Sequence, residues 1–188
     1  LFPLSKNGPD GVPSDPRPVA GPDPMYRFAA IVVLGMSASA IPGQFGVSCP
    51  GGAERMALEL EHLLSQPEFV DHILATPDVK NAFNTLSRIR IFEVLQDMQD
   101  VPVLQVFVDH FYRRTSTYVH TIQGDREVDL YHSNVGVVQG DPLAMFLFAL
   151  VENKCQNWIS TIIKNCQMAS GPDSPVQMPF DLPSELRC

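Results

Sequence analysis

Apolar residues recur at helical spacing along much of the chain. In 53–66, Met56, Leu60, Leu63 and Leu64 follow this spacing with glutamates between them, and 85–98 and 102–114 show similar patterns. Residues three and four apart share one face of a helix, so such stretches favour amphipathic helices. The apolar stretch 25–40 is also compatible with a helix. A further helix is expected from 141 to about 165, because Asp141 can cap it and Pro142 can occupy its first position.

Other stretches favour strands or loops. Residues 115–122 and 127–133 are rich in Thr, Tyr, Val and Ile and flank a polar turn, which predicts a hairpin. Residues 69–75 are expected to form a strand that leads to Asp78. Gly and Pro punctuate 1–24, which is expected to be extended or looped, and 166–188 is expected to be a Pro-rich irregular tail. The sum is an α+β fold with helices packed on a small antiparallel sheet.

The charge balance narrows the function classes. Thirteen Lys and Arg against 21 Asp and Glu give the 188 residues a net charge of −8. This argues against a protein that binds nucleic acid or anionic membranes by general electrostatics. The unbroken apolar run 28–34 is too short to span a bilayer, and no signal peptide is visible at the Leu1 start, which suggests a fragment. We therefore expect neither a membrane protein nor a secreted one.

Several motif classes find no support in the sequence. The four cysteines form no CxxC or CxxH pair, and the five histidines form no HxxxH or HExxH pattern. Neither a GxSxG elbow nor a GxxxxGK[ST] loop occurs. Five arginines either line a nucleic-acid channel or form a solvated face, and the sequence leaves this open: Arg88, Arg90, Arg113, Arg114 and Arg126.

Two short stretches have both a structural and a functional interpretation. Asp78 to Asn84 is explained as a turn that feeds a helix, and Gly140 with Asp141 and Pro142 as a tight turn followed by a cap. Alternatively, a carboxylate at the end of a core strand can hold Mg²⁺, because that cation prefers oxygen ligands. The structural interpretation leaves Gln139 unexplained, although glutamine is also common on surfaces.

Taken together, these stretches resemble the reverse transcriptase domain of non-long-terminal-repeat retrotransposons, above all the site-specific type. The matching motifs read DVKNAFN from Asp78 and QGDPL from Gln139. Upstream, LSK at 4–6, RPVA at 17–20 and YR at 26–27 are similar to the family's fingers segment. QFG at 44–46 and GGAE at 51–54 are similar to its Gly-rich stretch. The resemblance covers about residues 4–150, in the family's order.

The resemblance implies a right-hand polymerase fold, with a fingers-like segment at 1–66 and a partial palm at 67–165. It implies an RNA-directed DNA polymerase that extends a DNA primer on an RNA template by two-metal transfer from deoxynucleoside triphosphates. Asp78 would ligate Mg²⁺ as the catalytic carboxylate, with the carbonyl of Val79 beside it. The residues implied at the nucleotide are Phe83 as the gate against a ribose 2′-OH, Gln139 and Gly140 along the nucleotide, and Lys6 and Arg17 on its triphosphate.

The chain departs from this family in one decisive respect. A two-metal site needs a further Asp-Asp motif, and no Asp-Asp pair occurs in the 188 residues. Asp181 stands near the expected place, but Pro179 and Pro183 are unsuited to a central hairpin. We therefore expect the chain to be inactive alone. It is either a truncated polymerase or a non-catalytic remnant that keeps the palm-like fold and binds RNA or another partner, in the nucleus or the cytoplasm.

Overall fold

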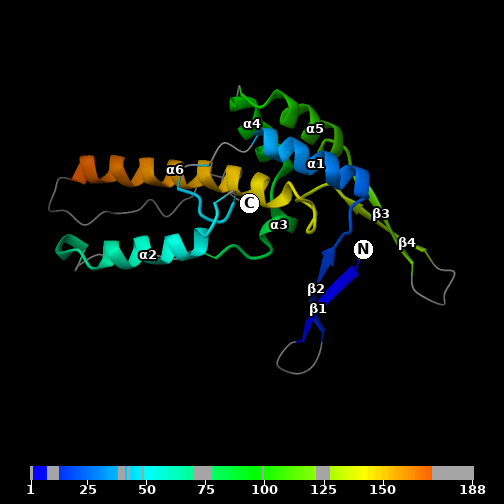
Figure 1. Cartoon of the computed structure of the whole chain (residues 1–188), viewed down its shortest axis with the longest axis horizontal. Coiled ribbons are helices and arrows are strands. Elements are labelled where there is room, and N and C mark those ends of the chain that lie inside the picture. Colours follow the sequence, from blue (N-terminus) through cyan, green and yellow to red (C-terminus); the bar gives the residue numbers. More distant parts are fainter. Residues whose placement is uncertain are drawn as a thin grey trace.

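Six α-helices and two β-hairpins make up the described part of the chain (Figure 1). The structure is a computed structural model that describes residues 2–7, 13–37, 41, 43–47, 49–69, 78–98, 100–121 and 128–170. The elements follow in the order β1 (Phe2–Asn7), β2 (Pro13–Val19), α1 (Pro24–Ser37), α2 (Gly52–Leu64), the 3-10 helix η1 (Pro67–Phe69), α3 (Ala82–Thr85), α4 (Arg88–Asp97), α5 (Pro102–Tyr112), β3 (Ser116–Thr121), β4 (Val128–Ser133) and α6 (Ala144–Ser170).

The core is built by helix packing against helix. Helix α1 packs on α5, α4 on both α5 and α6, and the short α3 on α6. The first half of α6 lies deepest, because its apolar residues occupy nearly every position there. The largest side chains with under 2% exposure are Phe146, Ile91, Leu104, Leu143, Leu147 and Val108. Removing this apolar surface from water supplies the main driving force for folding.

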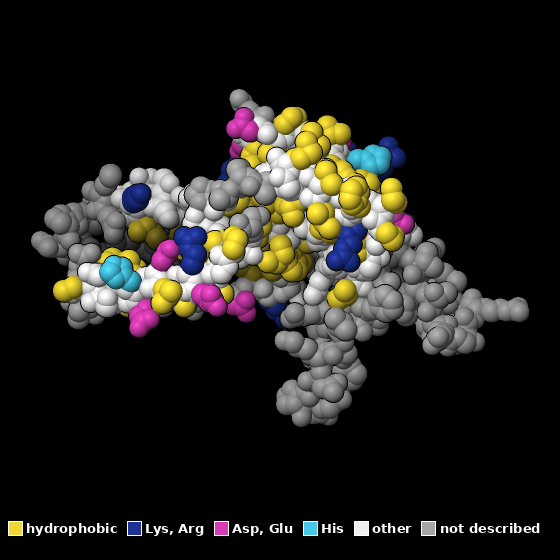
Figure 2. All heavy atoms as spheres, in the orientation of Figure 1, with side chains coloured by type: hydrophobic (Ala, Val, Ile, Leu, Met, Phe, Trp, Pro, Cys, Tyr) yellow, Lys and Arg dark blue, Asp and Glu magenta, His cyan; other side chains and the backbone are white. Residues whose placement is uncertain are grey.

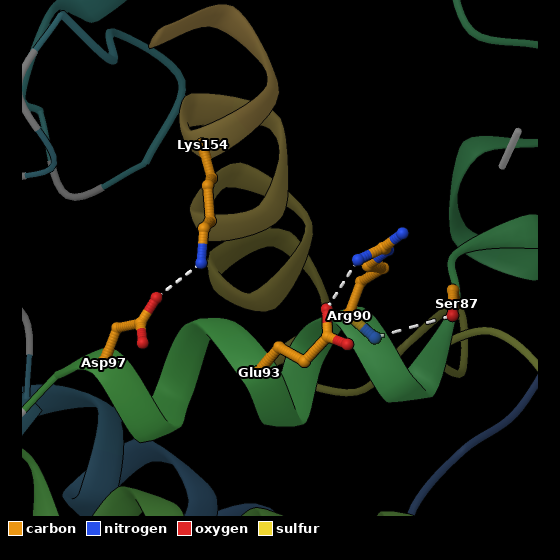
Figure 3. A network of polar contacts seen from close by, with 5 residues as sticks. All are labelled: Ser87, Arg90, Glu93, Asp97 and Lys154. Carbon is orange, nitrogen blue, oxygen red and sulfur yellow. Dashed lines mark hydrogen bonds and ion pairs between the residues drawn. The ribbon is translucent and has the colours of Figure 1, made fainter. Parts of the chain in front are cut away.

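Helix α4 is fixed at both ends by polar contacts (Figure 3). At its start, the Ser87 hydroxyl accepts a hydrogen bond from the Arg90 backbone N–H at 3.5 Å, as an N-cap does. One turn on, Arg90 pairs with Glu93 at 2.8 Å. At its end, Asp97 pairs with Lys154 of α6. These ion pairs are largely exposed, so each contributes well under about 1 kcal/mol, and they orient α4 more than they stabilise it.

Both sheets are two-stranded and antiparallel. In the first, Phe2 lies opposite Val19 and Asn7 opposite Pro13, with a bulge between Leu4 and Lys6. In the second, β3 and β4 pair without interruption from Ser116–Ser133 to Thr121–Val128. The two hairpins are separate sheets, and among the described elements the main packing partners of the helices are other helices. The expected α+β mixture is therefore present, but as two hairpins beside a helical core.

The predicted helices are confirmed at α1, α2, α4, α5 and α6, and the predicted hairpin at β3–β4. The segment expected to be extended or looped at 1–24 contains the β1–β2 hairpin and the first residue of α1. Of the strand expected at 69–75, Phe69 lies in η1, and 70–75 lie outside the described residues. Helix α6 continues to Ser170, and the rest of the expected tail is also outside them. No helix in the described part of the chain combines the length and the apolar character needed to cross a bilayer.

Candidate functional site

Three segments that are far apart in the sequence meet through their backbones. Phe83 accepts a hydrogen bond from Val137 N–H at 2.7 Å, and Leu86 accepts one from Gly136 N–H at 2.8 Å. On the other side, Ala20 N–H donates to the carbonyl of Gln139 at 3.0 Å, which extends a parallel bridge between Val19 and Gln139. We call the set 19–20, 83–86 and 136–141 the junction. It joins the end of β2, the start of the α3–α4 region and the approach to α6.

Two glycines allow the junction to close. Gly136 has a φ of 76°, and a Cβ there would lie 2.5 Å from the carbonyl oxygens of both Phe83 and Asn84. Gly140 has a φ of 106°, and a Cβ there would lie 2.2 Å from the carbonyl oxygen of Ala20. Residues other than glycine rarely adopt these φ angles, and neither position has room for a Cβ atom. The backbone approach thus explains both glycines, whereas the sequence had indicated only a tight turn at Gly140.

Asp141 carries the principal buried carboxylate of the junction. Its side chain is 8% exposed and accepts hydrogen bonds from the Tyr26 hydroxyl at 2.6 Å and from the Tyr112 hydroxyl. The other oxygen accepts from Leu143 N–H at 2.9 Å, which closes a turn just before α6. The helix begins at Ala144, so Pro142 lies in this turn and not at the first helical position that the sequence predicted. Burial, and then the charge of Asp141, raise the pKa of Tyr112 well above its usual range. One carboxylate therefore ties α1, α5 and α6 together.

Arg88 forms the second buried polar centre. Its side chain is 7% exposed, and its guanidinium donates to the carbonyl of Gly136 at 2.9 Å and to the carbonyl of Arg114 at 3.1 Å. It also donates to the Ser133 hydroxyl at 3.1 Å and lies over the ring of Tyr112. Arg88 therefore stabilises the fold, and both sequence interpretations of it, a channel lining and a solvated face, are wrong.

The Asp78 motif leads into the junction. Asp78 and Val79 are exposed. Asn81 adopts a left-handed conformation with a φ of 54°, which turns the chain into α3. Phe83, within α3, is half-buried and packs edge to face on Phe148 of α6 at 5.8 Å. The structural interpretation expected a turn from Asp78 to Asn84. The structure has a turn that leads into the short helix α3, and this helix holds the ring of Phe83 at the surface of the core.

The remaining predicted site residues lie on the other side of the junction. Gln139 is half-buried, and Gly140 is exposed. Lys6 lies in β1 and Arg17 in β2, and their side chains are outside the described part. Since β2 runs directly into Val19 and Ala20, the hairpin that carries Lys6 and Arg17 is joined to Gln139. The structure thus brings together the backbones of the β2, Phe83 and Gln139 segments.

The described donors do not fit a two-metal site. Asp78 offers one exposed carboxylate, and Val79 offers a backbone carbonyl. Across residues 2–170, as far as they are described, no three His, Cys, Asp or Glu side chains gather where they could hold a metal ion. A single carboxylate binds hydrated Mg²⁺ weakly. Further carboxylates from outside the described residues would be needed before Asp78 could take part in metal chemistry.

A cavity of about 370 Å³ lies beside the Gly-rich stretch. It is formed where the loop before α2 and the first turns of that helix approach the middle of α6, and its lining comprises Gly43, Gln44, Phe45, Gly46, Ala53, Met56, Asn153 and Gln156. Gly52 lets this loop close, because a Cβ there would lie 1.7 Å from the carbonyl oxygen of Phe45. The stretch that resembles the family's Gly-rich segment therefore lines a real hollow.

Sequence reasoning missed the polar partners that hold the junction. In the sequence Tyr26 stands out only as half of a YR pair, and nothing in the pattern around Tyr112 distinguishes it from a core aromatic. Both partners of Asp141 are distant in sequence, and the alternation of apolar and polar residues carries no information about such pairs. A buried arginine such as Arg88 is equally hard to foresee, because most arginines are exposed.

Comparison of the chain with protein-family models, with curated proteins and with solved structures gave no match in any of the three.

Proposed function

We propose that the chain is a piece of an RNA-directed DNA polymerase, with the fingers and part of the palm of a reverse transcriptase domain similar to those of site-specific non-long-terminal-repeat retrotransposons. In that family the domain extends a DNA primer on an RNA template, using deoxynucleoside triphosphates and Mg²⁺. The fingers-like part would span 1–66 and the partial palm 67–165. The parent protein would work in the nucleus or the cytoplasm.

The junction is the single observation that carries this proposal. The resemblance implies that Phe83 and Gln139 act at one nucleotide. Their segments meet through the hydrogen bonds that Val137 N–H donates to Phe83 and Gly136 N–H donates to Leu86. The hairpin with Lys6 and Arg17 is joined to Gln139 through Ala20 N–H. Three motifs that the family uses together are thus neighbours in space.

Within this proposal each residue has a defined task. The ring of Phe83, braced by Phe148, would form a rigid wall against the sugar of the incoming nucleotide. The amide of Gln139 can both donate and accept hydrogen bonds beside the base. Gly140 would let the backbone approach the template. Lys6 and Arg17 would bind the triphosphate, for which a guanidinium is the better bidentate partner.

The chain alone should not polymerise. Asp78 would be the catalytic carboxylate and, with the carbonyl of Val79, the anchor for Mg²⁺, but the described donors do not complete a two-metal site. We expect no primer extension by the 188-residue chain in Mg²⁺ or Mn²⁺. Robust incorporation that is lost in Asp78→Asn would contradict this expectation while supporting the polymerase assignment.

The decisive experiment uses the reading frame as it extends beyond the codon for Cys188. The proposal expects an Asp-Asp hairpin and a thumb there, and an expressed protein that copies an RNA template. Asp78→Asn should lower its rate at least about 1,000-fold, since a metal ligand is lost, whereas Lys80→Gln, two residues away and equally exposed, should change it little. A frame that continues into another kind of domain would overturn the proposal.

A second candidate is a non-catalytic remnant or interaction module that keeps the same framework. The polar network supports it, because Asp141 and Arg88 are satisfied within the fold itself and need no nucleotide. This candidate predicts that the reading frame stops directly after Cys188. It also predicts that the 188-residue chain folds cooperatively on its own, which thermal unfolding would test.

A further inference from the structure

The outer surface of α1 and the adjoining surface of α5 expose large apolar side chains. Figure 2 shows hydrophobic side chains gathered over these two helices. The members are between 40% and 75% exposed, and we call them the apolar face: Met25, Phe28, Ile31, Val32 and Met36 on α1, and Val103, Val106 and Phe111 on α5. A patch of this kind on a soluble domain marks an interaction site.

Helix α1 is apolar on two opposite sides. Ala30, Val33 and Ser37 are its buried residues, on the side that packs against the rest of the fold. On the other side, Met25, Phe28, Val32 and Gly35 recur at spacings of three and four residues and are exposed. A helix that covers only a core needs one apolar stripe. The second stripe therefore fits a further helix packed against it.

The two helices form one continuous surface. Tyr26 of α1 packs against Phe107 at 5.6 Å and edge to face against Phe111 at 4.6 Å, both on α5. Beside this contact, a groove of about 510 Å³ runs along α5, and it is lined by Pro102, Val103, Val106, Phe107, His110 and Phe111. The exposed apolar side chains of α1 and the groove of α5 thus lie next to each other.

We propose that the apolar face is covered by a second copy of this chain, in a two-fold dimer whose α1 helices pair antiparallel. Eight large side chains with these exposures leave on the order of 800 Å² in water, which is about what one partner contributes to a standard interface. Each copy carries a charge of −8, so two copies repel one another over most of their surface. Arg27 is the only charged residue of α1, and the copies can therefore meet here at low electrostatic cost.

The sequence of α1 suits a self-complementary contact. In an antiparallel pair centred between Ile31 and Val32, Phe28 of each copy lies opposite Gly35 of the other. A Cβ built at Gly35 meets no atom within 4 Å, so the position offers open space for a ring. The same contact occurs twice, as a two-fold interface requires.

The test is the mass of the intact chain by light scattering and sedimentation over a concentration series. We expect twice the 20.8 kDa chain mass at the high end of the series. Gly35→Glu should raise the dissociation constant of the dimer by about 30-fold or more, as at a central hot spot. The fold should survive, because the side chain enters open space and glutamate is a better helix former than glycine.

Leu58→Glu is the matched control. Leu58 is 65% exposed on α2, outside the apolar face, so this variant should dimerise like the unaltered chain. Circular dichroism checks that both variants keep the helical content. A chain that is monomeric at every concentration overturns the proposal, and so does a Gly35→Glu protein that dimerises normally or a wild type that forms only polydisperse aggregates. None of these outcomes bears on polymerase ancestry, which rests on the junction.

Discussion

At the scale of single residues, the carboxylate of Asp141 does more than its place in the sequence indicates. The Asp-Pro pair predicted a helix cap, and Asp141 accepts a hydrogen bond from Leu143 N–H in the turn that precedes α6. The same carboxylate also accepts hydrogen bonds from the hydroxyls of Tyr26 and Tyr112, which belong to two other helices. A carboxylate in a poorly solvated place needs such donors, because desolvation without them costs several kcal/mol. Asp141, a residue of the QGDPL motif, therefore also links three helices of the fold.

Tyr112→Phe should destabilise the protein. The change removes one donor from a buried carboxylate, so we expect a loss of about 1–3 kcal/mol in the free energy of unfolding, measured by urea titration at pH 7. Tyr26→Phe removes the more exposed of the two donors, and its effect should be smaller. Equal, negligible effects of both substitutions would show that the network contributes nothing to stability.

The same substitution should alter the pH dependence of stability. The pKa of Tyr112 is raised in the folded state from 10.0, chiefly by burial. The folded protein then keeps this proton while the unfolded chain releases it, so the contribution is complete below pH 10 and declines as pH rises above it. The decline is at most about 1.4 kcal/mol per pH unit. Urea titrations from pH 8 to above pH 10 should show a steeper decline for the wild type than for Tyr112→Phe.

Gly140→Ala should be severely destabilising. Position 140 has a φ of 106°, and the new methyl group would lie 2.2 Å from the carbonyl oxygen of Ala20, so the junction must open or distort. We expect a cost of about 2–4 kcal/mol in the free energy of unfolding. Gly21→Ala is the control, since a Cβ there meets nothing within 4 Å. A Gly140→Ala protein as stable as the control would refute the close approach.

At the scale of elements, apolar periodicity was sufficient to predict α2, α4 and α5, but it did not predict the short α3 or the β1–β2 hairpin. The repeats over 85–98 and 102–114 include the residues that α4 and α5 bury, which is local information. The repeat over 53–66 also forms a helix, but Met56, Leu63 and Leu64 of α2 are 45–50% exposed. The hairpin contains Pro3, Pro13 and Pro18 within its pairing, residues that usually interrupt strands. A two-stranded ribbon tolerates prolines because each strand has an unpaired edge. The sequence of one strand does not show which edge is paired, so the hairpin could not be predicted from it.

Arg88→Lys tests how α4 is joined to the turns on either side of the second hairpin. The planar guanidinium donates hydrogen bonds to Gly136, Arg114 and Ser133 at the same time. A lysine ammonium cannot reach all three acceptors. We expect a loss of about 2–4 kcal/mol in thermal or urea unfolding. Hydrogen exchange should speed up in the backbone that follows β4.

Arg90→Lys is the control for that change. Arg90 lies two residues further along the same helix, and its ion pair with Glu93 is exposed, so its replacement should cost less than about 0.5 kcal/mol. If both substitutions have this small effect, the buried contacts of Arg88 do not stabilise α4.

At the scale of the whole molecule, the sequence could indicate which motifs belong together but not how they are held. The segments of Phe83 and Gln139 were paired from resemblance, and they are neighbours in the structure. The means of contact could not be foreseen, because it consists of backbone hydrogen bonds and two glycine approaches at Gly136 and Gly140.

The net charge of −8 gives a last prediction for the molecule as a whole. Nucleic-acid affinity comes largely from neutralised phosphates, and a chain with an excess of acidic residues repels them. Fluorescence anisotropy with a labelled RNA–DNA hybrid at 150 mM salt should therefore show no saturable binding by the 188-residue chain below about 100 µM. This outcome is the one that the proposal of a truncated polymerase expects. An RNA-binding module would instead bind by itself, so tight saturable binding would favour that candidate over the truncated enzyme.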